Sequence, residues 1–265
     1  MQNSMNKTEN VRTQYADDKN LAVRSRLHTL YSTNRQGLIS WLFEQYDFIE
    51  GCQILELGCG NASQWDNRVN KLPSGAELVL SDFSEGMVGI VRSKYDGTPN
   101  AKAEQVDIQS IPYEDDLFDV VIANHMLYHV PDIDKGLSEV RRVLRPNGVF
   151  YATTNGNGGM RVFLRKAFLT LDSNSSAFMQ TLSFSTQNGA DILKRRFSQV
   201  EYRDYPDSLE ITNTNDLMEW IKSTISIATY SGEQIAGLFD YFESIRQRDG
   251  VIRILKECGL FVCGK

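Results

Sequence analysis

The chain has 265 residues and a net charge of −6 at pH 7, from 28 Lys and Arg against 34 Asp and Glu. An acidic chain does not hold nucleic acid or an anionic membrane by bulk charge, so we expect neither as a partner. Four cysteines without CxxC spacing favour neither a zinc module nor a disulfide scaffold. The polar start and the lack of a long apolar run predict a cytoplasmic protein without a membrane span.

The first 48 residues are expected to form a polar tail and a helical lid. Residues 1–12 are polar, and apolar side chains then recur at helical spacing over residues 15–46. The Ser-Thr-Asn run at 32–34 divides this stretch into two predicted helices, and its Ser or Asn is a candidate cap for the second one.

From residue 49 onward, short apolar runs alternate with helix-sized segments. We interpret five runs as strands, at residues 52–57, 77–81, 102–106, 118–124 and 149–154. Helices are predicted between them at 84–93 and 135–144, and the second helix stops at an Arg-Pro-Asn-Gly turn. Alternating strands and helices imply βαβ units, so the predicted fold class is α/β with a doubly wound parallel sheet.

The last third of the chain is less regular. We place helical caps around residues 155–195 and 212–247, as insertions in a core that extends over 49–265. Strand-like runs occur within 199–205 and 251–263. The aromatic side chains of the second cap are expected to form its own core rather than an aromatic box; they are Trp220, Tyr230 and Phe239.

The most specific motif is the run ILELGCGNAS at residues 54–63. Its glycines follow a strand directly and let a ligand approach the backbone, and a helix after them would offer free N–H groups to a negative group. Asp82 ends the next predicted strand, where a carboxylate can accept hydrogen bonds from ribose hydroxyls. Asp107 ends the strand after that, where it could meet an adenine edge.

Two cofactor classes use such a site. A dinucleotide enzyme has a third glycine where Ser63 stands, so a nicotinamide-dependent oxidoreductase is the weaker interpretation. The pattern E-x-G-x-G-x-A, together with Asp82 and Asp107, instead resembles the class I S-adenosylmethionine-dependent methyltransferases. Segments that resemble later elements of that family follow in order, so the resemblance extends over about residues 50–154.

The resemblance implies a Rossmann-like, mostly parallel sheet of seven strands that ends in an antiparallel hairpin. The runs at 199–205 and within 251–263 would supply that hairpin. Ala62 stands where the family commonly has a third glycine in its loop, and we expect it to have a negative φ. Asn147 replaces the first glycine of a frequent Pro-Gly-Gly turn, and we expect a left-handed conformation there.

The resemblance also implies which residues bind S-adenosyl-L-methionine. Those expected at its methionine end and sulfonium are Glu56, Gly58, Cys59, Gly60 and Asn124. Those expected around the nucleoside are Asp82, Phe83, Met87, Asp107 and Ile108. A purely structural role stays open for several of them, as a strand-to-helix turn at the glycines, a helix cap at Asp82 or a turn at Asp107.

Histidine is the usual general base near neutral pH, so the three histidines are candidates for a catalytic role. His125 and His129 lie close behind the fourth predicted strand and are the candidate bases, although His129 has a packing role as its alternative. Their spacing of four would also suit a metal, but no third ligand is evident, and we predict no metal site. His28, in the N-terminal helices, is a candidate to line the substrate pocket.

The N-terminal helices are either an amphipathic cap or a lid over the cofactor. In the second interpretation, Tyr15 or Arg24 would meet the cofactor's carboxylate, because that group needs a hydroxyl or a cation. We therefore predict a methyltransferase that methylates an oxygen, nitrogen or carbon nucleophile of a small molecule. A non-catalytic nucleoside-binding module is the alternative, and the sequence leaves the acceptor and the oligomeric state open.

Overall fold

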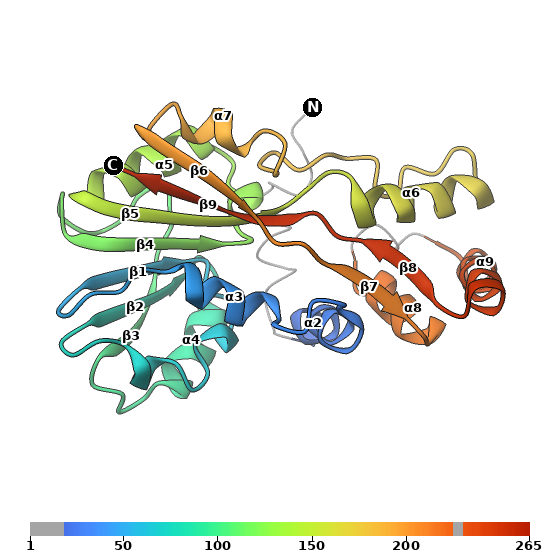
Figure 1. The fold of residues 1–265 in the computed structure, drawn as a ribbon, viewed down its shortest axis with the longest axis horizontal. Helices are drawn as coiled ribbons and strands as arrows, with labels where there is room; N and C mark the ends of the chain where they lie inside the picture. Colours follow the sequence, from blue (N-terminus) through green and yellow to red (C-terminus); the bar gives the residue numbers. More distant parts are fainter. Residues whose placement is uncertain (1–18, 225–229) are drawn as a thin grey trace.

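The structure is a computed structural model, and it describes residues 19–224 and 230–265. A seven-stranded sheet with helices on its faces forms the larger part, which we call the core. A smaller group of helices around a two-stranded sheet forms the second lobe (Figure 1). A pair of long antiparallel strands runs from one part into the other.

The sheet of the core has the strand order β3-β2-β1-β4-β5-β9-β6. Its strands are β1 (Gln53–Leu57), β2 (Glu77–Asp82), β3 (Ala101–Gln105), β4 (Phe118–Asn124), β5 (Leu144–Asn155), β6 (Gln199–Asp204) and β9 (Cys258–Gly264). The first five strands of that order are parallel, and β9 is antiparallel to both of its neighbours. The predicted doubly wound sheet of seven strands with a final antiparallel hairpin is confirmed.

Alternate side chains of the central strands enter two separate hydrophobic clusters. In β1, Ile54 packs in the cluster on one face of the sheet and Leu55 in the cluster on the other face, and both are fully buried. Four α-helices cover these faces: α3 (Leu38–Gln45), α4 (Glu85–Lys94), α5 (Ile133–Val143) and α7 (Gly189–Leu193). Side chains cap two of them, because Ser84 accepts from the amide of Met87 and Asp132 from that of Lys135.

The second lobe gathers segments that lie far apart in the sequence. Its helices are α2 (Lys19–Tyr31), α6 (Gly159–Leu171), α8 (Thr214–Lys222) and α9 (Gly232–Asp249). They pack on a two-stranded antiparallel sheet of β7 (Ser208–Ile211) and β8 (Ile252–Leu255). Their buried side chains form a third hydrophobic cluster, separate from the two in the core.

Strands β6–β7 and β8–β9 form one ribbon, which we call the bridging ribbon. In the core Asp204 pairs with Gly259, and in the second lobe Ser208 pairs with Leu255, so the register is unchanged between the two sheets. Backbone bonds also cross the interruption, from the Tyr205 amide to the Cys258 carbonyl at 2.9 Å. The ribbon therefore fixes the second lobe against the sheet (Figure 1).

The structure differs from the predicted organisation in how the caps are assembled. The two N-terminal helices separate, since α2 packs in the second lobe whereas α3 packs on the core. The region 155–195 is likewise divided, because α6 joins the second lobe and α7 the core. Helix α3 begins after Gly37 without any side-chain cap, so the predicted Ser or Asn cap is wrong.

Two local predictions also fail. Only two short 3₁₀ turns follow β1 before β2, η2 (Ser63–Trp65) and η3 (Val69–Lys71), where a helix was expected. Asn147 lies inside β5 and does not have a positive φ, so the predicted left-handed turn is wrong. In the described part of the chain, no helix has the length and apolar character needed to cross a membrane.

Candidate active site

The glycine loop leaves the sheet at the carboxyl end of β1, between β2 and β4. Crossovers run in opposite directions from this strand, which makes the crevice here the usual ligand site of doubly wound sheets. Gly58 and Gly60 have φ values of 68° and 58°, which glycine adopts without strain. A Cβ on Gly58 would lie 2.8 Å from Cβ of Met126, so only glycine fits there.

Ala62 has a φ of 52°, so the expected negative φ is wrong. An alanine in the left-handed region costs about 1–2 kcal/mol relative to the right-handed one. Its side chain is fully buried, and its amide donates to the Cys59 carbonyl at 3.0 Å, which closes the loop on itself. The backbone thus makes the turn that the family's third glycine would make, and it enters η2 instead of an α-helix.

Asp82, at the end of β2, links the glycine loop to the start of α4. One carboxylate oxygen accepts from the Gly60 amide at 2.9 Å, and the other accepts from the Ser84 amide at 2.8 Å. Burial raises the pKa of Asp82, and these two backbone donors oppose the rise. Since Ser84 caps α4 itself, the Asp82 carboxylate keeps lone pairs for further donors on its partly exposed side.

Glu56 lies fully buried beneath the loop. Its carboxylate accepts hydrogen bonds from Nε2 of the Gln64 side chain and the Trp65 indole, and from Nδ2 of Asn124 at 3.5 Å. Burial raises the pKa of Glu56 to about 7, against the lowering effect of those three donors. Glu56 therefore ties the turn after the loop to the neighbouring strand β4.

Asn124, the last residue of β4, extends this network toward α3 and β5. Its Nδ2 donates to the Tyr46 hydroxyl at 2.9 Å and to the Gln64 side-chain oxygen at 3.1 Å. Its side-chain oxygen accepts from the Thr153 hydroxyl. The structure thus brings Glu56, Asn124 and the glycine loop together at one edge of the sheet.

The residues expected around the adenine differ in how deeply they are buried. Phe83 is half-buried, whereas Met87 is fully buried and Ile108 nearly so, packing near Gly136. Asp107 stands two residues beyond β3 and forms a turn, in which its carboxylate accepts from the Gln109 amide at 2.8 Å. These four residues surround the end of β2 and β3, and their contact with an adenine stays a prediction.

His125 follows Asn124 directly and has an unusual environment. Its φ is 53°, and its amide donates to the Thr153 carbonyl at 3.0 Å. Its Nδ1 is buried without a hydrogen-bond partner, and its Nε2 lies 4.0 Å from Sγ of Cys258. Burial, followed by the charge of Lys256, lowers the pKa of His125 to about 4, so the imidazole is neutral at physiological pH.

The second candidate base is placed differently. His129 ends a 3₁₀ turn, η4 (Leu127–His129), and its ring packs edge-on against Tyr128 with centroids 4.6 Å apart. Within the described ranges, no group of three or more His, Cys, Asp or Glu side chains is arranged to hold a metal. Of the two candidates, His125 is the one with an unbonded ring nitrogen next to the loop network.

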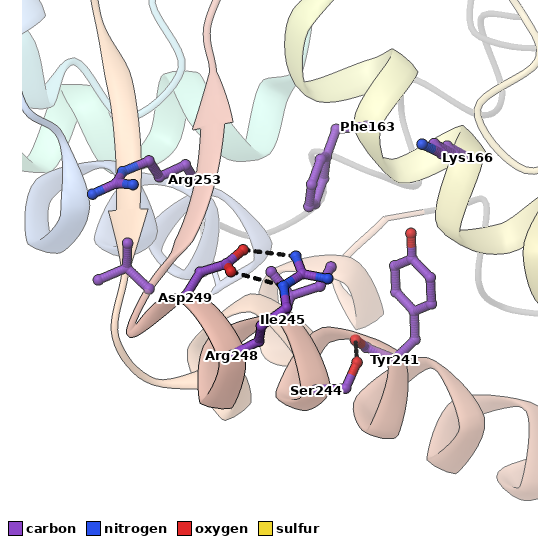
Figure 2. A pocket seen from close by; sticks show the side chains of 9 residues that line it. Phe163, Lys166, Tyr241, Ser244, Ile245, Arg248, Asp249 and Arg253 are labelled. Atoms are coloured by element: carbon purple, nitrogen blue, oxygen red, sulfur yellow. Dashed lines mark hydrogen bonds and ion pairs between the residues drawn. The ribbon is translucent and has the colours of Figure 1, made fainter.

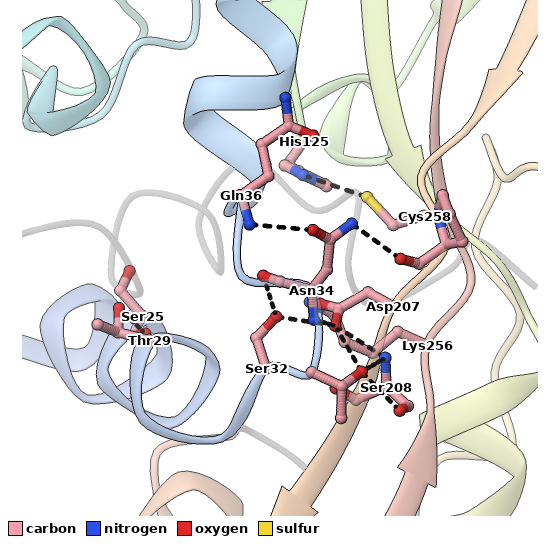
Figure 3. Close-up of polar contacts among 12 residues, drawn as sticks. Ser25, Thr29, Ser32, Asn34, Gln36, His125, Asp207, Ser208, Lys256 and Cys258 are labelled. Carbon is pink, nitrogen blue, oxygen red and sulfur yellow. Dashed lines mark hydrogen bonds and ion pairs between the residues drawn. The ribbon is translucent and has the colours of Figure 1, made fainter.

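The bridging ribbon brings a polar cluster to His125, and apart from His28 the residues of this cluster were not candidates in the sequence. We call this place the junction; its residues are His28, 32–34, His125, 205–207 and 256–258. Asp207 is the centre of its hydrogen bonds, and it accepts from the Lys256 ammonium, the Ser32 hydroxyl at 2.8 Å and the Asn34 amide at 3.1 Å (Figure 3). No signal in the sequence pointed to Asp207 or Lys256, because each stands at the edge of a strand-like run and in no recognisable motif.

Of the two N-terminal residues proposed to meet the cofactor, Arg24 lies in the second lobe, away from the glycine loop. Arg24 donates to the Ser223 carbonyl at 2.6 Å, beyond the end of α8 in the second lobe. This bond fastens α2 to α8, and a role of Arg24 at the cofactor stays a prediction. Tyr15 lies outside the described residues.

A separate cavity of about 400 Å³ lies in the second lobe, between α6, α9 and β8 (Figure 2). Phe163 and Tyr241 line it together with charged side chains. Two of these already have carboxylate partners, since Arg248 pairs with Asp249 at 2.7 Å and Arg253 pairs with Glu210 at 3.1 Å. The cavity is lined by none of the residues described above, so it is not part of the candidate active site.

Comparisons with known proteins agree with this geometry. A family model described as a methyltransferase domain matches residues 55–152. The ubiquinone/menaquinone biosynthesis C-methyltransferase UbiE of Geobacter sulfurreducens is 31% identical over 202 residues, which are 70% of this chain and 73% of the relative. A demethylmenaquinone methyltransferase of Staphylococcus aureus is 29% identical over 166 residues, or 58% of this chain and 68% of the relative.

Solved structures share the fold. The phosphoethanolamine N-methyltransferase 2 of Haemonchus contortus in complex with S-adenosyl-L-methionine superposes with a TM-score of 0.61 at 18% identity. That likeness covers 99% of this chain and 60% of the other. At such an identity it shows the architecture alone.

Proposed function

The chain belongs to the class I S-adenosylmethionine-dependent methyltransferases, and from that premise we propose that it methylates a small molecule held between the glycine loop and the second lobe. S-adenosyl-L-methionine is the methyl donor of this family. The main support is the hydrogen bond that the Gly60 amide donates to Asp82. It brings the glycine loop and the carboxylate expected to bind the ribose together at one edge of the sheet. The substrates in the relatives' names are not transferred to this chain, because the family match covers residues 55–152 and, of the junction residues, includes only His125.

The residues at the carboxyl ends of β1, β2 and β4 fit the donor. The loop around Gly58 has no room for a side chain, and its backbone is accessible only because glycine stands there. Asp82 keeps acceptor capacity for ribose hydroxyls, and buried Glu56 holds the loop from below. Phe83, Met87, Asp107 and Ile108 are assigned to the adenine side and Asn124 to the sulfonium side.

S-adenosyl-L-methionine, when bound, supplies a methyl group activated on a sulfonium. The chain therefore mainly aligns the acceptor in line with that methyl group and excludes water, and such positioning alone can supply about 7–11 kcal/mol. The bond from carbon to sulfur breaks as the bond from carbon to the acceptor forms, and the electron pair stays on sulfur. Nδ1 of His125 takes the acceptor's proton, because it is unbonded, neutral and adjacent to Asn124.

Binding of S-adenosylhomocysteine to Asp82→Asn tests the donor site. Asparagine has the size of aspartate, but its single side-chain oxygen can accept from only one of the Gly60 and Ser84 amides, and the charge that holds two hydroxyls is lost. We expect the affinity to fall roughly ten- to a hundredfold, the value of one or two charge-assisted hydrogen bonds. Isothermal titration calorimetry measures this directly.

Asp96→Asn is the matched control. Asp96 is exposed in the turn after α4, and this substitution also removes one negative charge from the core. Its affinity should stay within about twofold of wild type. Equal affinities of the two variants would contradict the assignment of Asp82 to the ribose.

A further inference from the structure

The cavity in the second lobe has an apolar floor that the hydrophobic cluster of that lobe holds in place. Phe163 extends from α6 toward α9, and Tyr241 extends from α9 toward α6 (Figure 2). Both rings pack on the fully buried Phe242, whose ring centroid lies 5.9 Å from that of Phe163 and 5.4 Å from that of Tyr241. Ile245 and Val251 complete the half-buried part of the lining. The floor is therefore formed before any ligand arrives.

Helical spacing directs polar side chains to the same opening. On α9 the lining residues stand at positions 241, 244, 245 and 248, which share one face of a helix, and on α6 Lys166 stands three residues after Phe163. The exposed members of the lining are all polar or charged; they are Lys166, Ser244, Arg248, Asp249 and Arg253. A polar rim above an apolar floor, around a volume of about 400 Å³, is typical of a small-molecule site.

The charges of the rim leave one cation over. Arg248 pairs with Asp249 and Arg253 pairs with Glu210, so both guanidinium groups already have a counter-ion. Lys166 has no ion pair with any carboxylate that the structure describes, although the chain as a whole has a net charge of −6. A ligand with a single negative charge would balance Lys166, whereas a dianion would also have to compete with a carboxylate for one of the arginines.

We propose that this cavity is a second binding site, separate from the active site, for an aromatic compound that carries one carboxylate. The ring of the ligand lies against Phe163 and Tyr241, where aromatic rings gain more than the burial of apolar area alone. Its carboxylate pairs with Lys166 at the rim. The cavity shares no residue with the glycine loop or the junction, so the inference goes beyond the proposed function and does not depend on it.

Calorimetric titration of the full chain with 2-naphthoate and with 2-naphthamide tests the proposal. The two probes have the same ring system, and only naphthoate is charged. We expect naphthoate to bind saturably and about three- to tenfold more tightly than the amide, because an ion pair with an exposed lysine contributes modestly. Saturation with S-adenosylhomocysteine should leave the affinity for naphthoate within about twofold, since sites without shared residues act independently.

Two pairs of variants locate the bound probe. Lys166→Gln should abolish the preference for naphthoate over the amide, whereas Lys222→Gln, which removes an exposed charge from α8 of the same lobe, should preserve it. Ser244→Trp fills the opening of the cavity and should weaken both probes about tenfold or more. Ala236→Trp puts the same side chain on another face of α9 and should change neither affinity by more than about twofold. All four positions are exposed, so the variants should fold.

Three results would overturn the proposal. The first is that naphthoate shows no saturable binding, and the second is that naphthoate and the amide bind equally tightly. The third is that the two variants of either pair have equal effects, because the bound probe would then lie outside the cavity. None of these results bears on the binding of S-adenosylhomocysteine, so the proposed function is tested separately.

Discussion

The core and the second lobe are built in different ways. In the core, three of the four parallel pairs, β1–β2, β2–β3 and β4–β5, join strands that are consecutive in the sequence. In the second lobe, α2 packs on α8 and α6 on α9, and neither pair is consecutive in the sequence (Figure 1). The core is thus set mostly by local pattern, and the second lobe depends on long-range contacts.

The same contrast holds for the two halves of the candidate active site. The donor side is one contiguous loop closed by Asp82, and its buried acid is Glu56. The junction is assembled from α2, the end of β4 and both strands of the bridging ribbon. Burial disfavours the charged form in both halves, so it raises the pKa of the acid Glu56 and lowers those of the imidazoles of His28 and His125.

The largest effect on stability is expected from removing a large side chain from the hydrophobic cluster of the second lobe. Phe242 is fully buried there and stacks on Phe163 with centroids 5.9 Å apart. Phe242→Ala should lower the free energy of unfolding by about 3–5 kcal/mol. Because the donor site lies in the core, the affinity for S-adenosylhomocysteine should stay within about twofold. Urea unfolding and calorimetry measure the two quantities.

Leu255→Ala is the control for that change, since Leu255 belongs to the same lobe but is 74% exposed, and it should alter stability by about 0.5 kcal/mol at most. A loss of nucleoside affinity above tenfold in Phe242→Ala would show that the two parts are not independent.

The next effect concerns the ion pair at the junction. Asp207 is fully buried and Lys256 nearly so, and Lys256→Met leaves the carboxylate without its counter-ion. We expect a loss of about 3 kcal/mol in the free energy of unfolding. Adding Asp207→Asn should recover part of it, with a coupling of about 1–3 kcal/mol in a double-mutant cycle.

The pair Glu210–Arg253 is the matched comparison, because it lies across β7 and β8 of the same ribbon but is exposed. Its coupling should be about 0–1 kcal/mol. Equal coupling energies in the two double-mutant cycles would show that burial does not strengthen the pair Asp207–Lys256 relative to the exposed pair.

The smallest effect is the pH dependence of stability. The folded-state pKa values of His28 and His125 are about 3 and 4, below the ordinary value of 6.5, so the unfolded chain binds more protons and stability falls as the pH falls below 6.5. The pKa of Glu56 is raised to about 7 from 4.5, so the folded chain binds more protons and stability falls as the pH rises from 4.5 to above 7.

Thermal melts between pH 4 and 8 measure both the loss of stability on the acid side and the loss toward neutral pH. His28→Asn should flatten the loss on the acid side, and Glu56→Gln should flatten the loss toward neutral pH while leaving the acid side unchanged. Identical pH profiles of the two variants would contradict the opposite pKa shifts of Glu56 and His28.

Much of the donor side could be predicted from the sequence. The run at 54–63, with Asp82 at the end of the next strand, located the loop and its acid because both depend on neighbouring residues and on strand order. Ala62 shows the limit of that approach. Its residue type favours a negative φ, but the closed loop imposes the left-handed conformation that the turn requires.

The junction could not be predicted in the same way. The sequence determined the doubly wound sheet, the glycine loop and the candidate status of His125, because alternating patterns and short motifs are local. Only the tertiary structure decided that His28, Asp207 and Lys256 meet His125, since these residues come from α2 and from both strands of the ribbon. Burial and charge at that meeting point are properties of the packed chain, and no single segment carries them.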